Sequence, residues 1–137
     1  MFVIISSLCF ISHALPQRST CGGNCPGGCD QCPCGVQPSY ADIKQWCAKY
    51  NWNQENCECI MLNESRGNAN AVNQNDDGTY DVGLWQIDTV NWNACNGGRA
   101  PCGPTQNLNC AIDVYQWGGN TWRLWATCGR CNACNSH

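Results

Sequence analysis

Histidine is scarce in this chain of 137 residues: only His13 and His137 occur. Serine and cysteine nucleophiles that depend on a histidine base therefore have none within the body of the chain, and a catalytic zinc site built on histidines has no ligands. A phosphate-binding loop is also missing, because "CGGNCPGGC" has neither the Lys-Ser/Thr ending nor a preceding strand. The candidates that remain for proton chemistry are carboxylates.

Charge of either sign is sparse as well. Seven Lys and Arg stand against ten Asp and Glu, a net charge of −3, and the isoelectric point is near 5.1. Binding to nucleic acid rests on neutralising phosphates, and this sequence has no basic run. We therefore expect no nucleic-acid partner and no attraction to anionic membranes.

The first sixteen residues, "MFVIISSLCFISHALP", contain no Asp, Glu, Lys or Arg. Residues 2–11 are apolar but too few to span a bilayer, and residues 12–14 (Ser-His-Ala) are typical of a signal-peptidase site. We predict a secretory signal peptide over residues 1–14. The alternative is a buried N-terminal strand.

Cysteine, in contrast, is abundant. The 15 cysteines are typical of a disulfide scaffold in an oxidising environment. Loss of Cys9 with the signal peptide leaves an even number, which allows complete pairing but does not fix the connectivity. Zinc is the alternative for the dense clusters at residues 21–34 and 128–134, yet neither contains a histidine. We predict disulfides, no metal and no cofactor.

The rest of the chain is one domain by length. Residues 15–36 form a cysteine-rich N-terminal extension, expected to pack on the body rather than to act as a separate binding module. We expect residues 37–137 to form the domain that carries the functional site. We expect helices over residues 39–50, 53–65 and 107–117, a last short helix carrying Trp122 and Trp125, a loop over 91–106, and a hairpin around the Asp-Gly turn at 77–78. Helices around a small antiparallel hairpin make the fold α+β.

Two carboxylates stand out beside this hairpin. Glu64 lies in the last turn of a predicted helix, where the helix dipole disfavours its charged form, and burial would also keep it protonated. Asp81 lies on an asparagine-rich strand, where hydrogen-bond donors would keep it ionised. An acid and an ionised partner of this kind can cleave a glycosidic bond. The alternative for Glu64 is an ion pair with Arg66.

The segment from Glu64 to Ile87 resembles the active-site segment of the lysozyme superfamily, in its spacing of Glu-Ser, Asn, Asp-Gly, Asp, Gly and Gln-Ile. It is most similar to C-type lysozymes, with a second likeness to soluble lytic transglycosylases. The resemblance extends from Cys57 to Cys131 and implies a lysozyme-like fold. The cysteine-rich extension has no counterpart in C-type lysozymes.

The resemblance also implies roles for single residues. Glu64 matches the general acid and Asp81 the second carboxylate. The implied substrate-binding residues are Asn75, Gln86, Asp88, Trp92 and Trp122, the supporting residues Asp77 and Gly83, and the implied disulfide Cys59 with Cys128. Trp92 would line the saccharide cleft and Trp122 would wall the pocket of the acid, with Trp125 in the core. Asp88 departs from the pattern, because an asparagine usually stands there.

The function implied is that of a secreted, monomeric glycosidase that cleaves the β-1,4 glycan strands of bacterial peptidoglycan with paired carboxylates. Three alternatives remain: a lytic transglycosylase, a chitin oligosaccharide hydrolase, and a non-catalytic carbohydrate-binding module. Because the chain is acidic, it would be repelled from anionic walls at neutral pH. We therefore expect an acidic pH optimum and work in a digestive space, namely a phagosome, a lysosome or the gut lumen.

Overall fold

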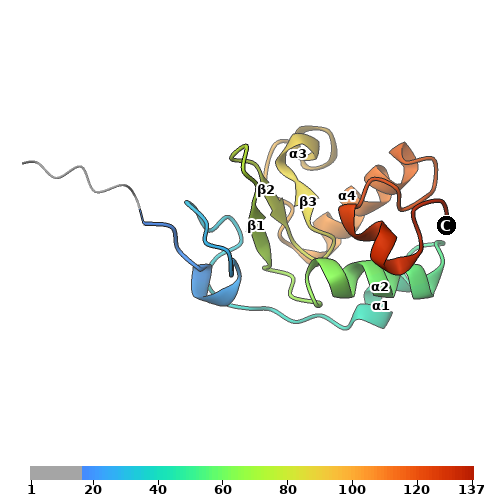
Figure 1. Cartoon of the computed structure of the whole chain (residues 1–137), viewed down its shortest axis with the longest axis horizontal. Helices are drawn as coiled ribbons and strands as arrows, with labels where there is room; N and C mark the ends of the chain where they lie inside the picture. The colour runs from blue at the N-terminus through green and yellow to red at the C-terminus, as the bar shows by residue number, and fades with distance from the viewer. Residues whose placement is uncertain (1–16) are drawn as a thin grey trace, which may run out of the picture.

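The structure is a computed structural model and describes residues 17–137, so the predicted signal peptide lies outside the described residues. Its helices are α1 (Ile43–Cys47), α2 (Gln54–Glu64), α3 (Thr89–Asn96) and α4 (Pro104–Trp117), with two 3-10 helices, η1 (Cys21–Gly23) and η2 (Ala126–Cys131). The strands are β1 (Val72–Gln74), β2 (Tyr80–Val82) and β3 (Ile87–Asp88). The sheet lies between the N-terminal extension on one side and α2, α4 and η2 on the other (Figure 1). The predicted α+β class is confirmed. Among the described residues, no helix has the length and apolarity to cross a membrane.

Helix α2 is the element that carries Glu64. Its N-cap is Asn53, whose side chain accepts a hydrogen bond from the Asn56 backbone N–H at 2.9 Å, which satisfies one of the free donors of the first turn. Cys57, Ile60 and Met61 are buried, and their i, i+3, i+4 spacing puts them on one face. The helix was predicted over residues 53–65, and its observed bounds differ by one residue at each end.

Other helices differ more from the predictions. The N-cap of α1 is Asp42, which accepts from the Gln45 backbone N–H, so the helix begins four residues after the predicted start. The expected loop over residues 91–106 contains most of α3. The last helix, η2, begins after Trp122 and Trp125 rather than carrying them. These segments are short or rich in glycine and asparagine, so the hydrophobic period is weak and tertiary contacts decide their state.

The sheet has the strand order β1-β2-β3 and is antiparallel throughout. The predicted hairpin corresponds to β1 and β2, and β3 is an additional strand. Val72 pairs with Val82, and Asn73 pairs with Asp81. Because successive side chains of a strand point to opposite faces, the buried valines lie on one face of the sheet and the polar pair on the other. The register thereby directs Asp81 away from the valine face.

Aromatic rings fill the core between the helices. Trp85, Trp122, Ile60 and Met61 are fully buried, and the ring of Trp122 lies 4.9 Å from that of Trp52 and 5.0 Å from that of Trp125. These rings hold α2 and α4 in place behind the site, so most of the tryptophan content is structural.

The N-terminal extension packs on the sheet as a compact unit, which we call the knot (residues 17–36). Two disulfides close it internally, Cys21–Cys32 and Cys25–Cys29, and Cys34–Cys102 joins it to the body. Its cysteines share a buried cluster with Val72 and Val82. The Asn24 carbonyl accepts from the Val72 backbone N–H at 2.9 Å. The knot therefore covers the edge strand β1, which would otherwise offer unpaired backbone groups.

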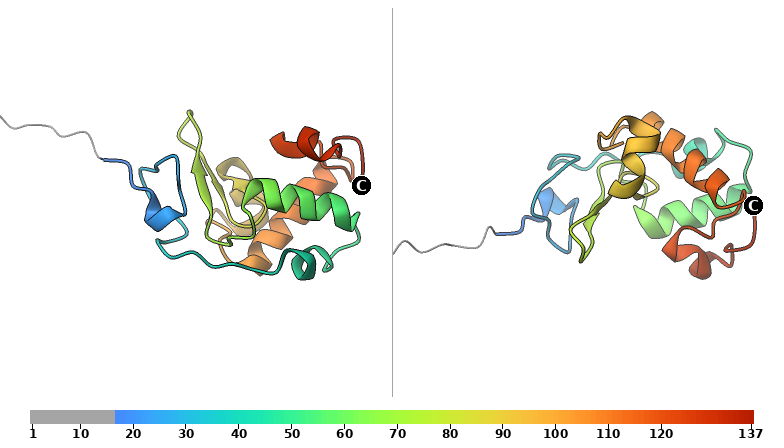
Figure 2. Two further views of the ribbon diagram at one scale, coloured as in Figure 1. Left: turned by 60° about the horizontal axis from the view of Figure 1, so that its bottom comes forward. Right: turned by 90° about the horizontal axis from the view of Figure 1, so that it is seen from above.

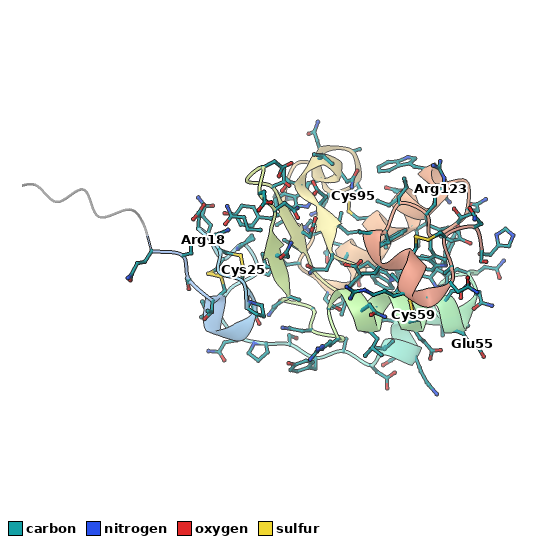
Figure 3. All side chains as sticks on the ribbon, in the orientation of Figure 1. Arg18, Cys25, Glu55, Cys59, Cys95 and Arg123 are labelled. Atoms are coloured by element: carbon teal, nitrogen blue, oxygen red, sulfur yellow. A yellow bond between two sulfur atoms is a disulfide. The ribbon has the colours of Figure 1, made fainter. Side chains whose placement is uncertain are left out.

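All fourteen cysteines of the described residues form seven disulfides, as predicted in place of zinc. Some of these bonds are visible in yellow in Figure 3. The predicted Cys59–Cys128 pair is wrong. Cys59 is bonded to Cys131, and Cys128 is bonded to Cys134. Cys128 and Cys131 lie three residues apart in η2, the repeat of a 3-10 helix, so they share one face. Spacing alone could not distinguish between them.

Candidate active site

Glu64 is the last residue of α2 and lies opposite η2. The Thr127 hydroxyl of η2 donates a hydrogen bond to Glu64 Oε1 at 2.6 Å, and the Cys59–Cys131 disulfide ties the two helices together beside it. Burial raises the pKa of Glu64 above its ordinary value of 4.5, although the Thr127 hydrogen bond and the charge of Arg130 act in the opposite direction. Glu64 therefore holds its proton to higher pH than a free glutamate.

The alternative reading of Glu64 as half of an ion pair is not supported. Among residues 17–137, the ion pair in the structure joins Arg18 and Asp30 in the knot. Arg66 follows α2 with a positive φ of 55°, which turns the chain away from the helix axis. The carboxylate of Glu64 thus has a hydroxyl as its hydrogen-bond partner and not a guanidinium.

Asp81 is the central residue of β2, and the sheet register places it between two polar neighbours. Asn73 lies opposite on β1, and Asp88 lies opposite on β3. Residues directly opposite in an antiparallel sheet have their side chains close together on the same face. The three side chains therefore form a row across the sheet, with one carboxyl group beside another.

The expectation that Asp81 stays ionised is wrong, first because Asp81 is buried and then because of this neighbour. Burial raises the pKa of Asp81 from 3.8 to about 7, together with a hydrogen bond to Asp88 and the charge of Asp88. The side chains of Asn75 and Asn73 act in the opposite direction but do not offset burial. Asp88 itself caps α3 by accepting from the Val90 backbone N–H at 2.9 Å. Asp81 therefore holds its proton to higher pH than a free aspartate does.

A cleft runs across the two carboxyl groups in two halves, and both halves are lined by Glu64, Asp81 and Gln86. The larger half, about 670 Å³, extends to the knot, and we call it the knot half. The smaller, about 300 Å³, extends to the segment before η2, and we call it the helical half. Figure 2 (left) shows the β1–β2 hairpin and η2 both projecting above α2. A ligand that spans both halves would pass directly over Glu64 and Asp81.

The floor of the cleft is fixed by the turn between β2 and β3. Gly83 has a φ of +81°, and a Cβ there would lie 2.1 Å from the Asn107 side-chain nitrogen, so only glycine fits. Asn107 is fully buried in α4. Its side chain donates to the carbonyls of Val82 and Pro101 and accepts from the Trp85 backbone N–H. The expected turn role of Gly83 thus has a structural basis.

Gln86, Asn75 and Asp77, which the resemblance placed at the site, all line the cleft, but they make different hydrogen bonds. Gln86 lines both halves, while its amide donates to the carbonyls of Ala71 and Gly83. Asn75 and Asp77 line the helical half. The Asn75 amide donates to Asp88 at 3.2 Å and also acts on Asp81. Asp77 accepts from Thr79 and supports the hairpin turn, without a hydrogen bond to Asp81.

Two tryptophans do not lie where the resemblance placed them. Trp122 is fully buried and its indole N–H donates to the His137 carbonyl; it does not line the cleft. Trp92 packs against the core, with its indole N–H on the Ile87 carbonyl, and also lies outside the cleft. Trp125 lines the helical half together with Glu64. The two indoles of "NTWRLW" lie three residues apart, so which one faces the cleft depends on how the chain enters η2.

Sequence reasoning missed several residues that shape the site. Thr127, which binds Glu64, has no distinguishing local pattern, and Asn107 was recognised only as the start of a helical stripe. Asn73 was expected only as one of several polar residues around Asp81, and the sheet register makes it the residue directly opposite. The knot residues that line the cleft carry no signal of their own in the sequence.

Comparison with known proteins shows the family to which the chain belongs. A family model described as a lysozyme-like domain matches residues 53–127, which contain Glu64, the sheet, Asp88 and Thr127. Lysozyme C of Takifugu rubripes is 40% identical over 53 residues, which are 39% of this chain and 36% of that protein. The alignment therefore spans little more than a third of that relative's length. Because the family model covers more than half of the 137 residues, the chain belongs to the family of lysozyme-like domains.

Proposed function

We propose that this protein is a glycosidase of the lysozyme type, and that it cleaves the β-1,4 glycan strands of bacterial peptidoglycan. The observation that carries the proposal is the position of Glu64 and Asp81 in one cleft of a lysozyme-like domain, since both carboxyl groups line both of its halves. A glycosidic bond that lies at the junction of the two halves is therefore within reach of both Glu64 and Asp81. No cofactor is required for this chemistry.

Glu64 is the general acid in this proposal. It donates its proton to the glycosidic oxygen as the bond to the anomeric carbon breaks, and it then takes a proton from the attacking water. Thr127 donates to Oε1, so Oε1 is the acceptor oxygen and Oε2 is free to carry the catalytic proton. Thr127 is thus a positioning residue, held by η2 and the Cys59–Cys131 disulfide.

Asp81 stabilises or attacks the anomeric carbon only when it is ionised. Because the pKa of Asp81 is about 7, Asp81 is ionised in about half of the molecules at pH 7 and in roughly a tenth of them at pH 6. The proposal therefore gives an activity that falls on the acid side of neutrality. Net charge predicts an acidic optimum instead, and the pH profile of wall clearing decides between the two predictions. The digestive location stays a prediction.

A lytic transglycosylase is the second candidate, and the raised pKa of Asp81 favours it. In that reaction the 6-hydroxyl of the sugar attacks in place of water, and Glu64 serves as both acid and base. A protonated Asp81 would be no obstacle to a reaction that uses one carboxyl group. The two reactions differ in their products, because transglycosylation yields an anhydro sugar that is lighter by one water molecule.

Clearing of a suspension of bacterial walls, followed by mass analysis of the fragments, tests the proposal. Hydrolysis gives reducing ends, transglycosylation gives anhydro ends, and release from chitin oligosaccharides identifies a broader substrate range. We predict that Glu64→Gln folds normally and loses activity by about 10²–10⁴-fold, the usual effect of removing a general acid. A variant that clears walls at the wild-type rate would refute the assignment of Glu64.

We further propose that the protein is secreted and acts as a monomer on cell walls. Seven disulfides are typical of proteins that mature in an oxidising compartment. Non-reducing size-exclusion chromatography of the culture medium from an expressing cell tests both statements. Retention of the chain inside the cell, or elution as a dimer, would contradict them.

A further inference from the structure

The knot lines the same cleft as the two carboxyl groups. Gly23, Pro26 and Gly27 are exposed and line the knot half, which Glu64 and Asp81 also line. The knot therefore does more than cover the edge of β1. It forms an end wall of the larger part of the candidate active site.

This wall is held rigidly. Asn24 is buried, and its side-chain amide donates to the carbonyls of Gly35 and Gln37 while its oxygen accepts from the Asn68 amide. A second contact joins Asp30 to Gln74 of β1, with hydrogen bonds of 2.8 Å in both directions. Together with the Cys34–Cys102 disulfide, these contacts fix the wall before any ligand binds. A preformed wall loses little conformational entropy when it contacts a ligand.

The chemistry of the knot half suits a neutral, hydroxyl-rich ligand. Its lining is rich in side-chain amides, which both donate and accept hydrogen bonds, and among the described lining residues Arg66 alone is positively charged. The knot contributes backbone at Gly23 and Gly27, where a Cβ would meet nothing within 4 Å, and the flat ring of Pro26. Open backbone and an apolar ring allow a sugar to approach closely. A volume of about 670 Å³ is within the range of about 300–1,000 Å³ of ligand sites.

We propose that the knot is a saccharide-binding wall of the cleft, which holds the units of a β-1,4-linked, N-acetylated glycan that lie to one side of the scissile bond. The proposal rests on the proposed function, since it assigns the knot half to the same glycan. It explains why a chain with this domain carries an extension that is bonded covalently to the body beside the active site.

The test adds a bulky side chain to the wall. Gly27→Trp places an indole in the knot half without a backbone clash, since the position is open and its φ is not in the left-handed region. The matched control is Gln31→Trp, which adds the same ring to an exposed knot residue outside the cleft. The rate constant kcat/KM is measured on oligosaccharides of increasing length, from chitin in one arm and from peptidoglycan glycan in the other.

For Gly27→Trp we expect a loss that grows with substrate length and reaches about tenfold, equal to about 1.4 kcal/mol of binding free energy, while Gln31→Trp behaves as wild type. If Gly27→Trp folds poorly, Pro26→Ala removes the apolar ring without adding bulk and should weaken long oligosaccharides in the same direction. Equal length dependence in wild type, Gly27→Trp and Pro26→Ala would overturn the proposal and leave the proposed function intact.

Failure of the proposed function has a different signature. If the wild-type protein cleaves neither glycan, the proposed function fails, and the knot is then judged by calorimetric binding of the longest oligosaccharide. Weaker binding to Gly27→Trp than to Gln31→Trp would still support the saccharide wall. A wild-type protein that neither cleaves nor binds either glycan overturns both proposals.

Discussion

Substitution of Asp88 by asparagine should move the acid side of the pH–activity profile. Asp88 faces Asp81 across β2 and β3, and it is the second cause, after burial, of the raised pKa of Asp81. The substitution removes the negative charge, and the new side-chain amide can donate to Asp81 where a carboxyl group stood. Asparagine is as good an N-cap as aspartate, so α3 should keep its first turn. The change should therefore lower the pKa of Asp81 without removing the cap of α3.

The expected change in the pKa of Asp81 follows from its two main causes, burial and the neighbouring Asp88. Burial remains in Asp88→Asn, so the pKa of Asp81 should stay above its ordinary 3.8 but fall well below the present value of about 7. Loss of a close like charge lowers a carboxyl pKa by about 1 or more. At pH 6 the ionised fraction of Asp81 would then rise from about one tenth to about one half, because each pKa unit is a factor of ten. We expect kcat/KM at pH 6 to rise about fivefold, with little change at pH 8.

The assay is the profile of kcat/KM between pH 4 and 9 for wild type, Asp88→Asn and Asp76→Asn. Asp76 is an exposed hairpin residue outside the cleft, so its variant has the same net charge as Asp88→Asn without altering the surroundings of Asp81. An acid midpoint that is the same in both variants, or higher in Asp88→Asn, would refute the reasoning.

The thermal stability of wild type and of Asp88→Asn should also depend differently on pH. A raised carboxyl pKa in the folded state gives a stabilising contribution that is present at low pH and lost as the pH rises through about 7. Wild type should therefore lose more thermal stability than Asp88→Asn between pH 5 and 8. Differential scanning calorimetry at several pH values measures this.

Three further outcomes are expected. Thr127→Val removes the donor to Glu64 Oε1 and so raises the pKa of Glu64. The basic side of the pH–activity profile should then move to higher pH and kcat should fall. Thr127→Ser keeps a hydroxyl donor and should restore both. Replacing Cys59 and Cys131 by alanine opens a loop with a sequence separation of 72 and should cost about 2–4 kcal/mol in the free energy of unfolding, measured by urea denaturation. Gly83→Ala combines a left-handed φ with a clash against a buried amide and should lower stability by about 1–3 kcal/mol; a melting temperature indistinguishable from that of wild type would contradict the fixed turn.

Local chemistry allowed a good part of the molecule to be predicted from its sequence. The N-cap Asn53 and the apolar spacing that follows it define α2 to within one residue at each end, because capping and helical period act over a single turn. The Asp-Gly turn likewise defines the β1–β2 hairpin, and the even number of cysteines after the predicted signal peptide indicates full pairing. The segment from Glu64 to Ile87 resembles the lysozyme superfamily, and this resemblance predicted the family that the comparison shows.

What only the tertiary structure decided depends on contacts between distant segments. Sequence does not fix which cysteine of η2 reaches Cys59, because Cys128 and Cys131 share a face and differ only in where the helix lies. The raised pKa of Asp81 depends on β3, a strand of two residues that has no sequence period and yet brings Asp88 beside it. The knot reaches the cleft because disulfides and buried amides fold it back on β1. The charge, burial and accessibility of a site residue depend on its neighbours in space. Neighbours that lie across strands or disulfides are distant in sequence, so only the complete fold brings them together.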